Sequence, residues 1–377
     1  MIKNKPITSQ IIYKNNHVSN IYEACTCCYD NTKKLDYFQK KEYIEKRINA
    51  GHESILEHGR LAIKISNITD SNLIVDITTY EHSRYLEFYT VHKEDNTYVL
   101  IINGNMRAYK YFITNITTND FDTNILVRHV YNILTDNTVG ALYGTEFKLS
   151  DEKPIFTDVE YINNEDEVSY NKLISPSTGI KYDFVIKDKI VDIPTTNTKE
   201  QVKSVDMGID ISYFEPLMND CDISDDIIFK ILTTTVVFKN MSRTATHQLV
   251  RHRNAITQES QRYVDSSNAT FTIPVPDYTE DTKYKISLFG QIKDISLFDL
   301  AKELMTVYDQ LLKAGLKKEE ARAFLPSNVN CRRLYMTFSI SNLLAFLKLR
   351  TDEHAQYEIR QYAKAVESEY MSILNLV

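Results

Sequence analysis

The pattern of apolar and polar positions predicts a chain that mixes helices and strands. Apolar residues at helical spacing predict helices over 38–50, 296–314 and 340–375. Alternating or short apolar runs predict strands, or short buried segments, over 61–66, 72–78, 97–102 and 232–238. Further helical segments are expected over 51–60, 106–112 and 242–253. Together these elements indicate an α+β protein with a mixed or antiparallel sheet and long helices.

The stretch 140–200 differs in composition from the rest of the chain. It is rich in Asp, Asn, Thr and β-branched residues and contains Pro154, Pro176 and Pro194, which predicts turns and short strands. A chain of 377 residues exceeds one typical domain. We therefore expect a domain boundary in this stretch, near residue 170, between domains 1–170 and 171–377.

Two weak internal similarities favour a diverged tandem duplication. LAIKISNITDSN resembles TVVFKNMSRTAT when Asn67 is placed over Asn240, 173 positions later. NGNMRAYKYF resembles SISNLLAFLK with Phe112 over Phe346, an offset of 234, although a shift of three would align Asn105 with Asn342 instead.

Composition excludes several classes of protein. The chain has 44 basic and 51 acidic residues without a block of like charge, which argues against a general nucleic-acid or membrane surface. No signal-peptide core and no run of 18 apolar residues is visible, so a cytoplasmic protein is expected. Five cysteines, three of them within four positions, suit no disulfide framework. The nine glycines form neither a Rossmann fingerprint nor a P-loop.

The densest group of chemically active residues is QLVRHRNAITQESQRYVD at 248–265. Arg251, His252 and Arg253 are adjacent, so on a helix they point to different sides and cannot all serve one ligand group. Ser260, followed by Gln261 and Arg262, offers a hydroxyl, a backbone N–H and a guanidinium, which are the parts of a phosphate site. A solvated basic turn is the alternative.

Two further groups are candidates. His52, Ser54, Glu57 and His58 lie on one segment, where Ser54 and His58 would share a helix face and reach a common ligand. The spacing does not suit zinc, and a capped helix with partly buried histidines is the alternative. Arg322 precedes a Pro-bounded turn and Arg350 follows an apolar helix face; each could equally be a salt-bridge partner, Arg350 to Asp352 or Glu353. Cys25, Cys27 and Cys28 lack a downstream pair for a metal site.

Taken together, the motifs resemble those of the flavin-dependent thymidylate synthase family. The family's H-E-S-x-x-E-H is matched by residues 52–58, and its S-R-x-x-x-H-Q-L-x-R-H-R by residues 242–253. Its S-Q-R-Y loop is matched by 260–263, its L-P turn by 325–326, and its L-R and H-A-Q-x-E-I segments by 349–350 and 354–359. The resemblance covers most of the second half and residues 20–112.

The resemblance implies a fold, a reaction and roles for individual residues. The reaction is reductive methylation of dUMP to dTMP, with FAD as cofactor and NADPH and methylenetetrahydrofolate as co-substrates. The family's nucleotide contacts correspond to Gln248, Arg251, Ser260, Gln261, Arg262, Arg322 and Arg350, of which Arg251 and Arg350 are expected to be catalytic, Arg350 at the uracil ring. Its flavin contacts correspond to Ser54, Asn105, Arg107, His252, Arg253 and Gln258. No cysteine nucleophile is needed, and the cysteines are distant in sequence from the phosphate motif.

The chain also departs from the family pattern. The loop between Arg253 and Ser260 is one residue shorter than usual. The flavin motif N-x-R is absent before the last helix, where Ser339 and Ser341 stand, but is present as Asn105 and Arg107 in the first half. The first half has Ile116 as the counterpart of Arg350. We therefore predict two fused, diverged copies of the family's fold, and a homodimer that acts as a pseudo-tetramer with one FAD per chain.

Two other functions stay open at this point. One is a related enzyme that transfers another one-carbon group or acts on another pyrimidine nucleotide. The other is a nucleotide-binding protein without catalytic activity. In each case the expected partners are small molecules, with no nucleic acid, no membrane and no bound metal.

Overall fold

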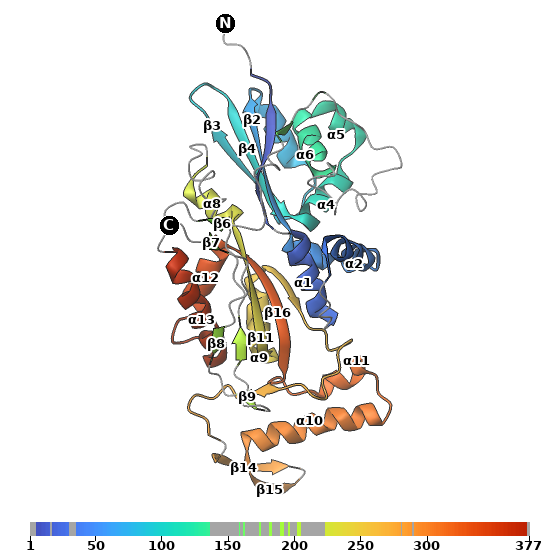
Figure 1. Cartoon of the computed structure of the whole chain (residues 1–377), viewed down its shortest axis with the longest axis vertical. Helices are drawn as coiled ribbons and strands as arrows, with labels where there is room; N and C mark the ends of the chain where they lie inside the picture. Colours follow the sequence, from blue (N-terminus) through green and yellow to red (C-terminus); the bar gives the residue numbers. More distant parts are fainter. Residues whose placement is uncertain are drawn as a thin grey trace. The chain divides into compact units, whose positions relative to one another are not determined.

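The computed structural model describes residues 5–15, 17–29, 35–135, 158, 161–162, 173–174, 181–182, 189–191, 195–196, 202–204, 223–279, 281–288 and 290–374. The chain forms two compact units (Figure 1). Unit 1 comprises Met1–Cys25, Lys33–Phe184 and Gly208–Thr234, and unit 2 comprises Thr26–Thr32, Val185–Met207 and Thr235–Val377. The predicted boundary near residue 170 lies outside the described residues.

Unit 1 is built on a five-stranded sheet in the order β3-β4-β2-β1-β5. Its strands are β1 (Thr8–Lys14), β2 (Arg60–Ile68), β3 (Leu86–His92), β4 (Tyr98–Asn105) and β5 (Tyr161–Ile162). β5 pairs with β1 in parallel, and the other pairs are antiparallel. Leu61, Ile63 and Ile65 alternate along β2 and are buried in the main core of the unit, so the alternation that predicted this strand is its buried face.

Unit 1 also contains helices, several of which add buried residues to the core that covers one face of this sheet. They are α2 (Tyr37–Asn49), α3 (Ser71–Thr79), α4 (Met106–Asn115), α5 (Thr118–Thr123) and α6 (Ile125–Thr135), with the 3₁₀ helix η1 (Glu53–His58) before β2 and α8 (Asp225–Ile231) before unit 2. Helix α1 (His17–Tyr29) begins in unit 1, and its last residues belong to unit 2. Asp36 and Gln39 form a capping box at the start of α2.

Unit 2 contains a three-stranded sheet in the order β11-β16-β12. Its strands are β11 (Thr233–Ser242), β12 (Ala255–Gln258) and β16 (Asn330–Ser339), and its main helices are α9 (Arg243–Leu249), α12 (Ile340–Arg350) and α13 (Tyr357–Leu374). Fully buried aromatic rings join strands to helices, because Phe346 of α12 lies 5.4 Å from Phe338 and 6.4 Å from Phe238 between ring centroids.

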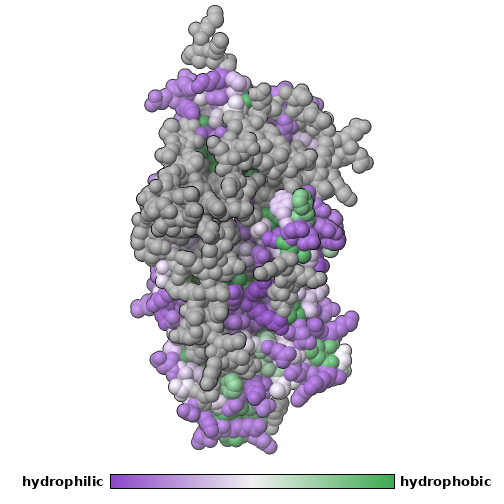
Figure 2. Space-filling model, viewed as in Figure 1, coloured by the Kyte–Doolittle hydropathy of each residue, from purple (hydrophilic) through white to green (hydrophobic). Residues whose placement is uncertain are grey.

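A second, smaller core lies under α10 (Leu297–Lys313). Ser296 caps this helix, and Gly315 adopts a φ of +96° just after it, as the sequence predicts for a helix C-terminus. The hairpin β14 (Lys283–Leu288) and β15 (Gln291–Ser296) precedes α10, and α11 (Lys318–Ala321) and the 3₁₀ helix η5 (Arg322–Phe324) follow it. Figure 2 shows green atoms interrupting the hydrophilic surface where Figure 1 places this part.

Residues 173–204 contribute several short strands. They are β6 (Leu173–Ile174), β7 (Lys181–Tyr182), β8 (Lys189–Val191), β9 (Thr195–Thr196) and β10 (Val202–Ser204), with β13 (Phe271–Thr272) as the partner of β9. The expected short strands of 140–200 are present at these positions. The remaining residues of that stretch, apart from Asp158 and strand β5, lie outside the described part of the chain.

Three of the predicted elements differ in the structure. The segment 72–78 is helical and belongs to α3, because Asp70 caps the helix and Ile74 and Ile77, three apart, form its buried face. The helix predicted over 340–375 is two helices, since Asp352 accepts hydrogen bonds from the N–H of His354 and of Ala355 in a turn. The helical stretch 51–60 is a short 3₁₀ helix.

The two units share an order of elements. In unit 1 the order is β2, α3, β3, β4, α4, with sheet order β3-β4-β2. In unit 2 it is β11, α9, β12, β16, α12, with β13, β14, β15, α10, α11 and η5 inserted between β12 and β16, and with sheet order β12-β16-β11. Asn67 and Asn240 both adopt left-handed backbone angles, with φ of 62° and 54°. Asn105 and Ser339 both cap the helix that follows the last strand.

Within the described residues no helix is long and apolar enough to cross a bilayer.

Candidate functional site

A short helical segment after β11 carries the first group of site residues. Ser242 caps α9, since its Oγ accepts from the N–H of Ala245 at 3.2 Å. The helix tightens into the 3₁₀ turn η4 (Val250–His252), which contains Arg251 and His252. Arg253 follows with a φ of 53°, a left-handed conformation that ends the turn and leads the chain into β12.

Arg350, at the end of α12, contacts this turn. Its Nε donates to Nε2 of His252 at 3.0 Å, and its two terminal nitrogens donate to the side-chain and main-chain oxygens of Gln248 at 3.3 and 3.4 Å. The structure thus brings together three predicted site residues from segments about a hundred positions apart. Asp352 bonds His354 instead, so the predicted alternative of an Arg350–Asp352 salt bridge is wrong.

His252 is held in its neutral form. Burial, followed by the positive charge of Arg350, lowers the pKa of His252 to about 4. Its ring also lies edge-on to Phe346 with 5.2 Å between centroids. Because Nε2 accepts from Arg350, the ring proton of the neutral form belongs on Nδ1, which can donate to a ligand.

Arg251 and Arg253 are exposed on the same turn. Within the described residues no carboxylate forms an ion pair with either guanidinium. Burial, and then the charge of Arg251, lowers the pKa of Arg350, so Arg251 and Arg350 are close enough to repel each other. Neighbouring cations without a counter-charge favour an anionic ligand, and phosphate is the group that guanidinium binds with two parallel hydrogen bonds.

The loop that begins at Ser260 forms the second group. The N–H of Arg262 donates to Ser260 Oγ, and two nitrogens of its guanidinium lie 3.2 and 3.3 Å from the carboxylate of Glu319. Nε of Arg322 donates to the carbonyl of Glu319 at 3.3 Å. The structure therefore joins the predicted residues Ser260, Arg262 and Arg322 through Glu319, which the sequence did not indicate. Gln261 is partly buried in this loop.

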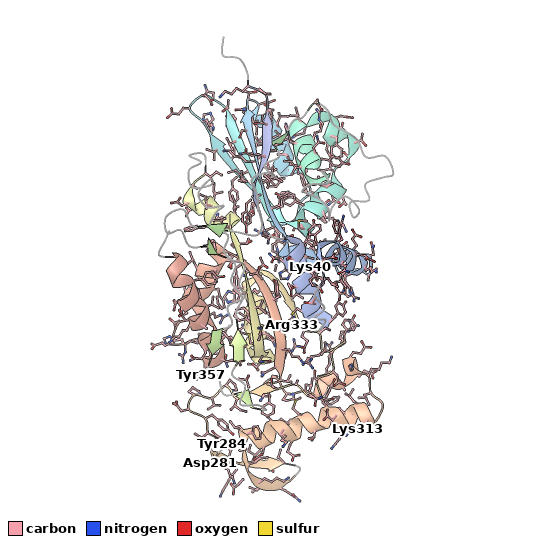
Figure 3. The ribbon with its side chains drawn as sticks, in the orientation of Figure 1. Lys40, Asp281, Tyr284, Lys313, Arg333 and Tyr357 are labelled. Atoms are coloured by element: carbon pink, nitrogen blue, oxygen red, sulfur yellow. The ribbon has the colours of Figure 1, made fainter. Side chains whose placement is uncertain are left out.

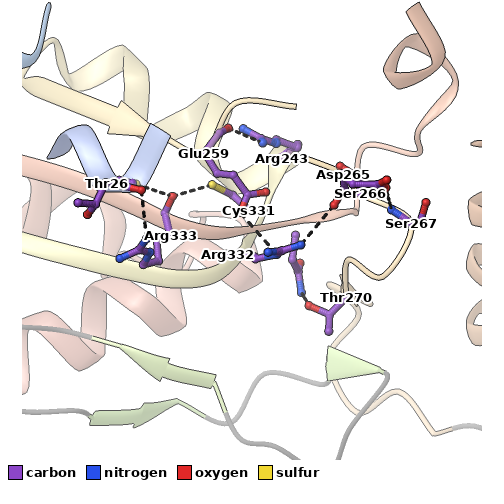
Figure 4. Close-up of polar contacts among 12 residues, drawn as sticks. Thr26, Arg243, Glu259, Asp265, Ser266, Ser267, Thr270, Cys331, Arg332 and Arg333 are labelled. Carbon is purple, nitrogen blue, oxygen red and sulfur yellow. Dashed lines mark hydrogen bonds and ion pairs between the residues drawn. The ribbon is translucent and has the colours of Figure 1, made fainter. Parts of the chain in front are cut away.

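The residue before this loop is fixed by three arginines (Figure 4). The main chain of Glu259 accepts from Arg243 at 2.8 Å and donates to the carbonyl of Arg333 at 3.2 Å. Its buried carboxylate lies 3.7 Å from Nε of Arg332. Arg333 lies on β16 and is labelled in Figure 3. Glu259 is thus an anchor for the adjacent Ser260.

Cys27, Cys28 and Cys331 lie next to this loop, although they are distant from it in sequence. The N–H of Ser260 donates to the carbonyl of Cys28 at 3.3 Å. The thiols of Cys27 and Cys331 donate to the carbonyl of Arg333 at 3.0 and 2.9 Å. Burial raises the pKa of both, that of Cys331 to about 11, so these thiols are not activated nucleophiles. No metal-binding group of His, Cys, Asp or Glu occurs in the described chain.

Gln258, the last residue of β12, has an unusual environment. Its Oε1 is buried and has no hydrogen-bond partner in the part of the chain that the structure describes, although the side chain as a whole is only partly buried. A buried amide oxygen without a donor costs free energy, so a ligand donor at this position would stabilise it.

In unit 1 the predicted flavin residues have defined contacts. Asn105 is 4 % exposed, and its Oδ1 accepts from the N–H of Ala108 at 2.8 Å as the cap of α4. Arg107 pairs with Glu57 at 2.6 Å, and the neighbouring Lys110 pairs with Glu53 at 2.7 Å. These pairs join η1 to α4.

The expectation that Ser54 and His58 face one ligand is wrong. Ser54 is exposed, whereas His58 is fully buried and burial lowers its pKa to about 3. The 3₁₀ geometry of η1 separates the two side chains, because residues four apart share a face on an α-helix but not on a 3₁₀ helix.

Comparisons with known proteins give the context of this geometry. The family model described as "Thymidylate synthase complementing protein" matches residues 190–374. The flavin-dependent thymidylate synthase of Pyrococcus furiosus is 35 % identical over 139 residues, 36 % of this chain and 53 % of that protein. That of Thermotoga neapolitana is 38 % identical over 120 residues, 32 % and 53 % of the two chains. That of Thermococcus kodakarensis is 31 % identical over 188 residues, 44 % and 72 %. The matches span about half the length of most of these relatives.

Proposed function

The chain belongs to the flavin-dependent thymidylate synthase family, and from that premise we propose that it methylates dUMP to dTMP reductively, with FAD, NADPH and methylenetetrahydrofolate. The observation that carries the proposal is the contact of Arg350 with His252 and Gln248 beside Arg251, which forms no ion pair with the described carboxylates. This arrangement offers guanidinium groups to an anion and holds one of them in a fixed orientation.

The two groups of residues suit different parts of a nucleotide. Arg251, Arg262 and Arg322, with Ser260 and Gln261, supply cations and hydrogen-bond donors for its phosphate. Arg350 has five N–H groups, three of which bond Gln248 and His252, so one N–H on each terminal nitrogen is left for a ligand. We assign this pair to the uracil ring, where it stabilises negative charge that develops near N3.

The residues present also fit FAD, whose diphosphate is anionic. Arg253 is exposed and carries no ion pair among the described residues, and Gln258 presents an unpartnered amide oxygen. With His252, Ser54, Asn105 and Arg107 they form the proposed flavin-binding set. When bound, FAD supplies the hydride acceptor for NADPH. Nδ1–H of His252 would donate a hydrogen bond to the bound flavin, and Arg253 would neutralise charge on the diphosphate of FAD.

We further propose that the chain is a diverged tandem duplication with its boundary near residue 170. Three observations support this: the common order of strands and helices in the two units, the left-handed Asn67 and Asn240, and the helix caps at Asn105 and Ser339. Because Asn105 and Ser339 occupy the same cap position, they support the alignment with an offset of 234, which pairs these two residues, over the one that pairs Asn105 with Asn342.

The proposed assembly is a cytoplasmic homodimer with one FAD per chain. Apolar side chains beside the site residues support a partner chain that covers them. Val250, Phe324 and Leu349 are 41, 58 and 61 % exposed, and they neighbour Arg251, Arg322 and Arg350 in sequence. Burial of such side chains is the usual source of stability in a dimer interface.

The function is tested with the purified full chain. A flavin absorbance spectrum and dUMP-dependent oxidation of NADPH, with tritium release from labelled dUMP, are the expected results. Flavin-dependent turnover of another pyrimidine nucleotide would indicate the related transferase instead. Nucleotide binding without NADPH oxidation would indicate a non-catalytic protein, and a colourless protein that does not bind dUMP would reject the proposal.

A further inference from the structure

Glu358 is a buried carboxylate that is not among the proposed ligand contacts. It binds the residue that caps the segment α9–η4, which carries Gln248 and His252. Glu358 on α13 is fully buried. One carboxylate oxygen accepts from the main-chain N–H of Ser242 at 2.7 Å, and the other accepts from its hydroxyl at 2.5 Å. Figure 3 labels Tyr357, the first residue of α13 and the neighbour of Glu358. Both hydrogen bonds therefore hold the cap residue of α9.

The same two chain segments also meet at their other ends. Residues 242–252 begin with Ser242 and end with His252, while residues 350–358 begin with Arg350 and end with Glu358. Ser242 bonds Glu358, and His252 bonds Arg350. The segments thus run in opposite directions and are joined at both ends. A shift at the Ser242 end changes where His252 and Gln248 meet Arg350.

The helix α9 has only seven residues, followed by one 3₁₀ turn. A helix this short is unstable by itself in water, so its position depends on its cap and its packing. Glu358 supplies the acceptor for the N–H of the cap residue and orients the capping hydroxyl. That hydroxyl can then accept from the N–H of Ala245 while donating to Glu358.

We propose that Glu358 is a positioning residue, which acts through Ser242 to hold Gln248 and His252 at the distances from Arg350 that dUMP turnover needs. The proposal rests on the proposed function for its substrate. It assigns to Glu358 no contact with substrate or flavin.

The first test uses the FAD-loaded full chain. Glu358→Gln keeps the shape of the side chain but offers one acceptor oxygen in place of two. We expect kcat for dUMP turnover to fall by about 10- to 100-fold, since small misplacements of a site have effects of this size, with a smaller change in KM. Ser242→Ala should act in the same direction, and Ser242→Thr, which keeps the hydroxyl, should restore turnover. Glu367→Gln, on the same helix, is the matched control and should turn over normally.

The second test needs no activity. In an NMR titration of the histidine rings, the signal of His252 is assigned by its loss in His252→Gln. Its pKa of about 4 reflects burial and contact with Arg350. In Glu358→Gln this pKa should rise toward the ordinary value of about 6.5, while that of the buried His129, in unit 1, stays unchanged. If Glu358→Gln does not fold, Ser242→Ala serves in its place.

The outcomes separate the two proposals. An unchanged pKa of His252 together with unchanged kcat would overturn the positioning role, as would equal changes in Glu367→Gln. The positioning role is supported if Glu358→Gln and Ser242→Ala lose turnover, Ser242→Thr does not, and the pKa of His252 rises in Glu358→Gln. If the wild-type chain neither binds nor converts dUMP, the proposed function fails, while the titration still decides whether Glu358 positions His252.

Discussion

Gln248 and His252 hold Arg350 and leave two of its N–H donors for a ligand. The effect of removing the side chain follows from this arrangement. We expect Arg350→Ala to lower kcat by about 100- to 1,000-fold, the usual effect of losing a donor to developing negative charge. Binding of dUMP should persist through the phosphate contacts. Steady-state kinetics and calorimetric binding of dUMP to the FAD-loaded protein provide the check. Unchanged turnover would remove Arg350 from the catalytic residues.

The phosphate contacts predict a different pattern. Arg251→Ala or Arg262→Ala should weaken dUMP binding by about 1.5–3 kcal/mol, the value of a hydrogen bond to a charged group, and FAD binding far less. Lysine should not restore a planar, two-bond contact. Glu319→Gln should strengthen dUMP binding slightly, because it frees Arg262 from an exposed ion pair worth at most about 1 kcal/mol. Equal losses for FAD and dUMP would contradict the assignment.

At the residue scale the sequence indicated the cationic groups but not their partners. Arg251, His252 and Arg253 are recognisable because they are adjacent; in the structure His252 is half-buried and the two arginines are exposed. Glu319 was not indicated, and Glu358 was indicated only as part of the matched segment 354–359, because each lies 57 or more positions from its partner. A carboxylate in an ordinary helical pattern carries no local sign of such a contact.

Helix α4 begins after Asn105, which caps it and which we propose to contact FAD. Asn105→Ala removes its cap and should destabilise the protein by about 1 kcal/mol, a typical value for a lost N-cap. Asn105→Ser keeps a capping hydroxyl but lacks the amide. If Asn105 contacts FAD, both variants should lose flavin during gel filtration, whereas chemical denaturation should show a loss of stability only for the alanine variant. Full flavin retention in Asn105→Ser would leave Asn105 as a cap alone.

Elements with a clear period or a strong cap were predicted well, and the others were not. The strands at 61–66, 97–102 and 232–238 and the helices at 38–50 and 296–314 are present. The short apolar run at 72–78 predicts a strand or a short buried segment, and its β-branched Ile74, Val75 and Ile77 are typical of strands. Its cap at Asp70 and its buried face of Ile74 and Ile77 outweigh that propensity. The order of strands in each sheet depends on long-range pairing, which a single sequence does not reveal.

For the molecule as a whole, buried histidines predict acid sensitivity. Burial lowers the pKa of His58 to about 3 and of His129 to about 4, below the ordinary value of about 6.5 in the unfolded chain. Between these values the unfolded state binds protons that the folded state does not, so stability falls as the pH falls from about 6.5. For His58 the loss from pH 6.5 to pH 5 is about 2 kcal/mol.

Urea unfolding at pH 7 and pH 5 measures this effect. His58→Gln should show a smaller loss of stability on acidification than the wild-type chain, whatever its stability at pH 7. The comparison between the two proteins is needed because burial raises the pKa of Glu358, which acts with the opposite sign. An identical pH dependence in both proteins would show that His58 is protonated to the same extent in the folded and unfolded states.

The number of flavins per chain is the prediction that tests the whole proposal of two diverged copies. Asn105 and Arg107 occur only in the first half, and Arg251, His252 and Arg253 only in the second, where Ser339 and Ser341 replace the flavin motif. If each half has lost what the other retains, a chain binds one FAD, and a homodimer binds two. Flavin absorbance against protein concentration gives the ratio of flavin to chain, and light scattering gives the mass of the assembly.

Asn105→Ala with Arg107→Ala should abolish flavin retention, whereas Ser339→Ala with Ser341→Ala should weaken the cap of α12 but leave flavin bound. Two flavins per chain, or the reverse mutational pattern, would show that each half has kept a flavin site of its own.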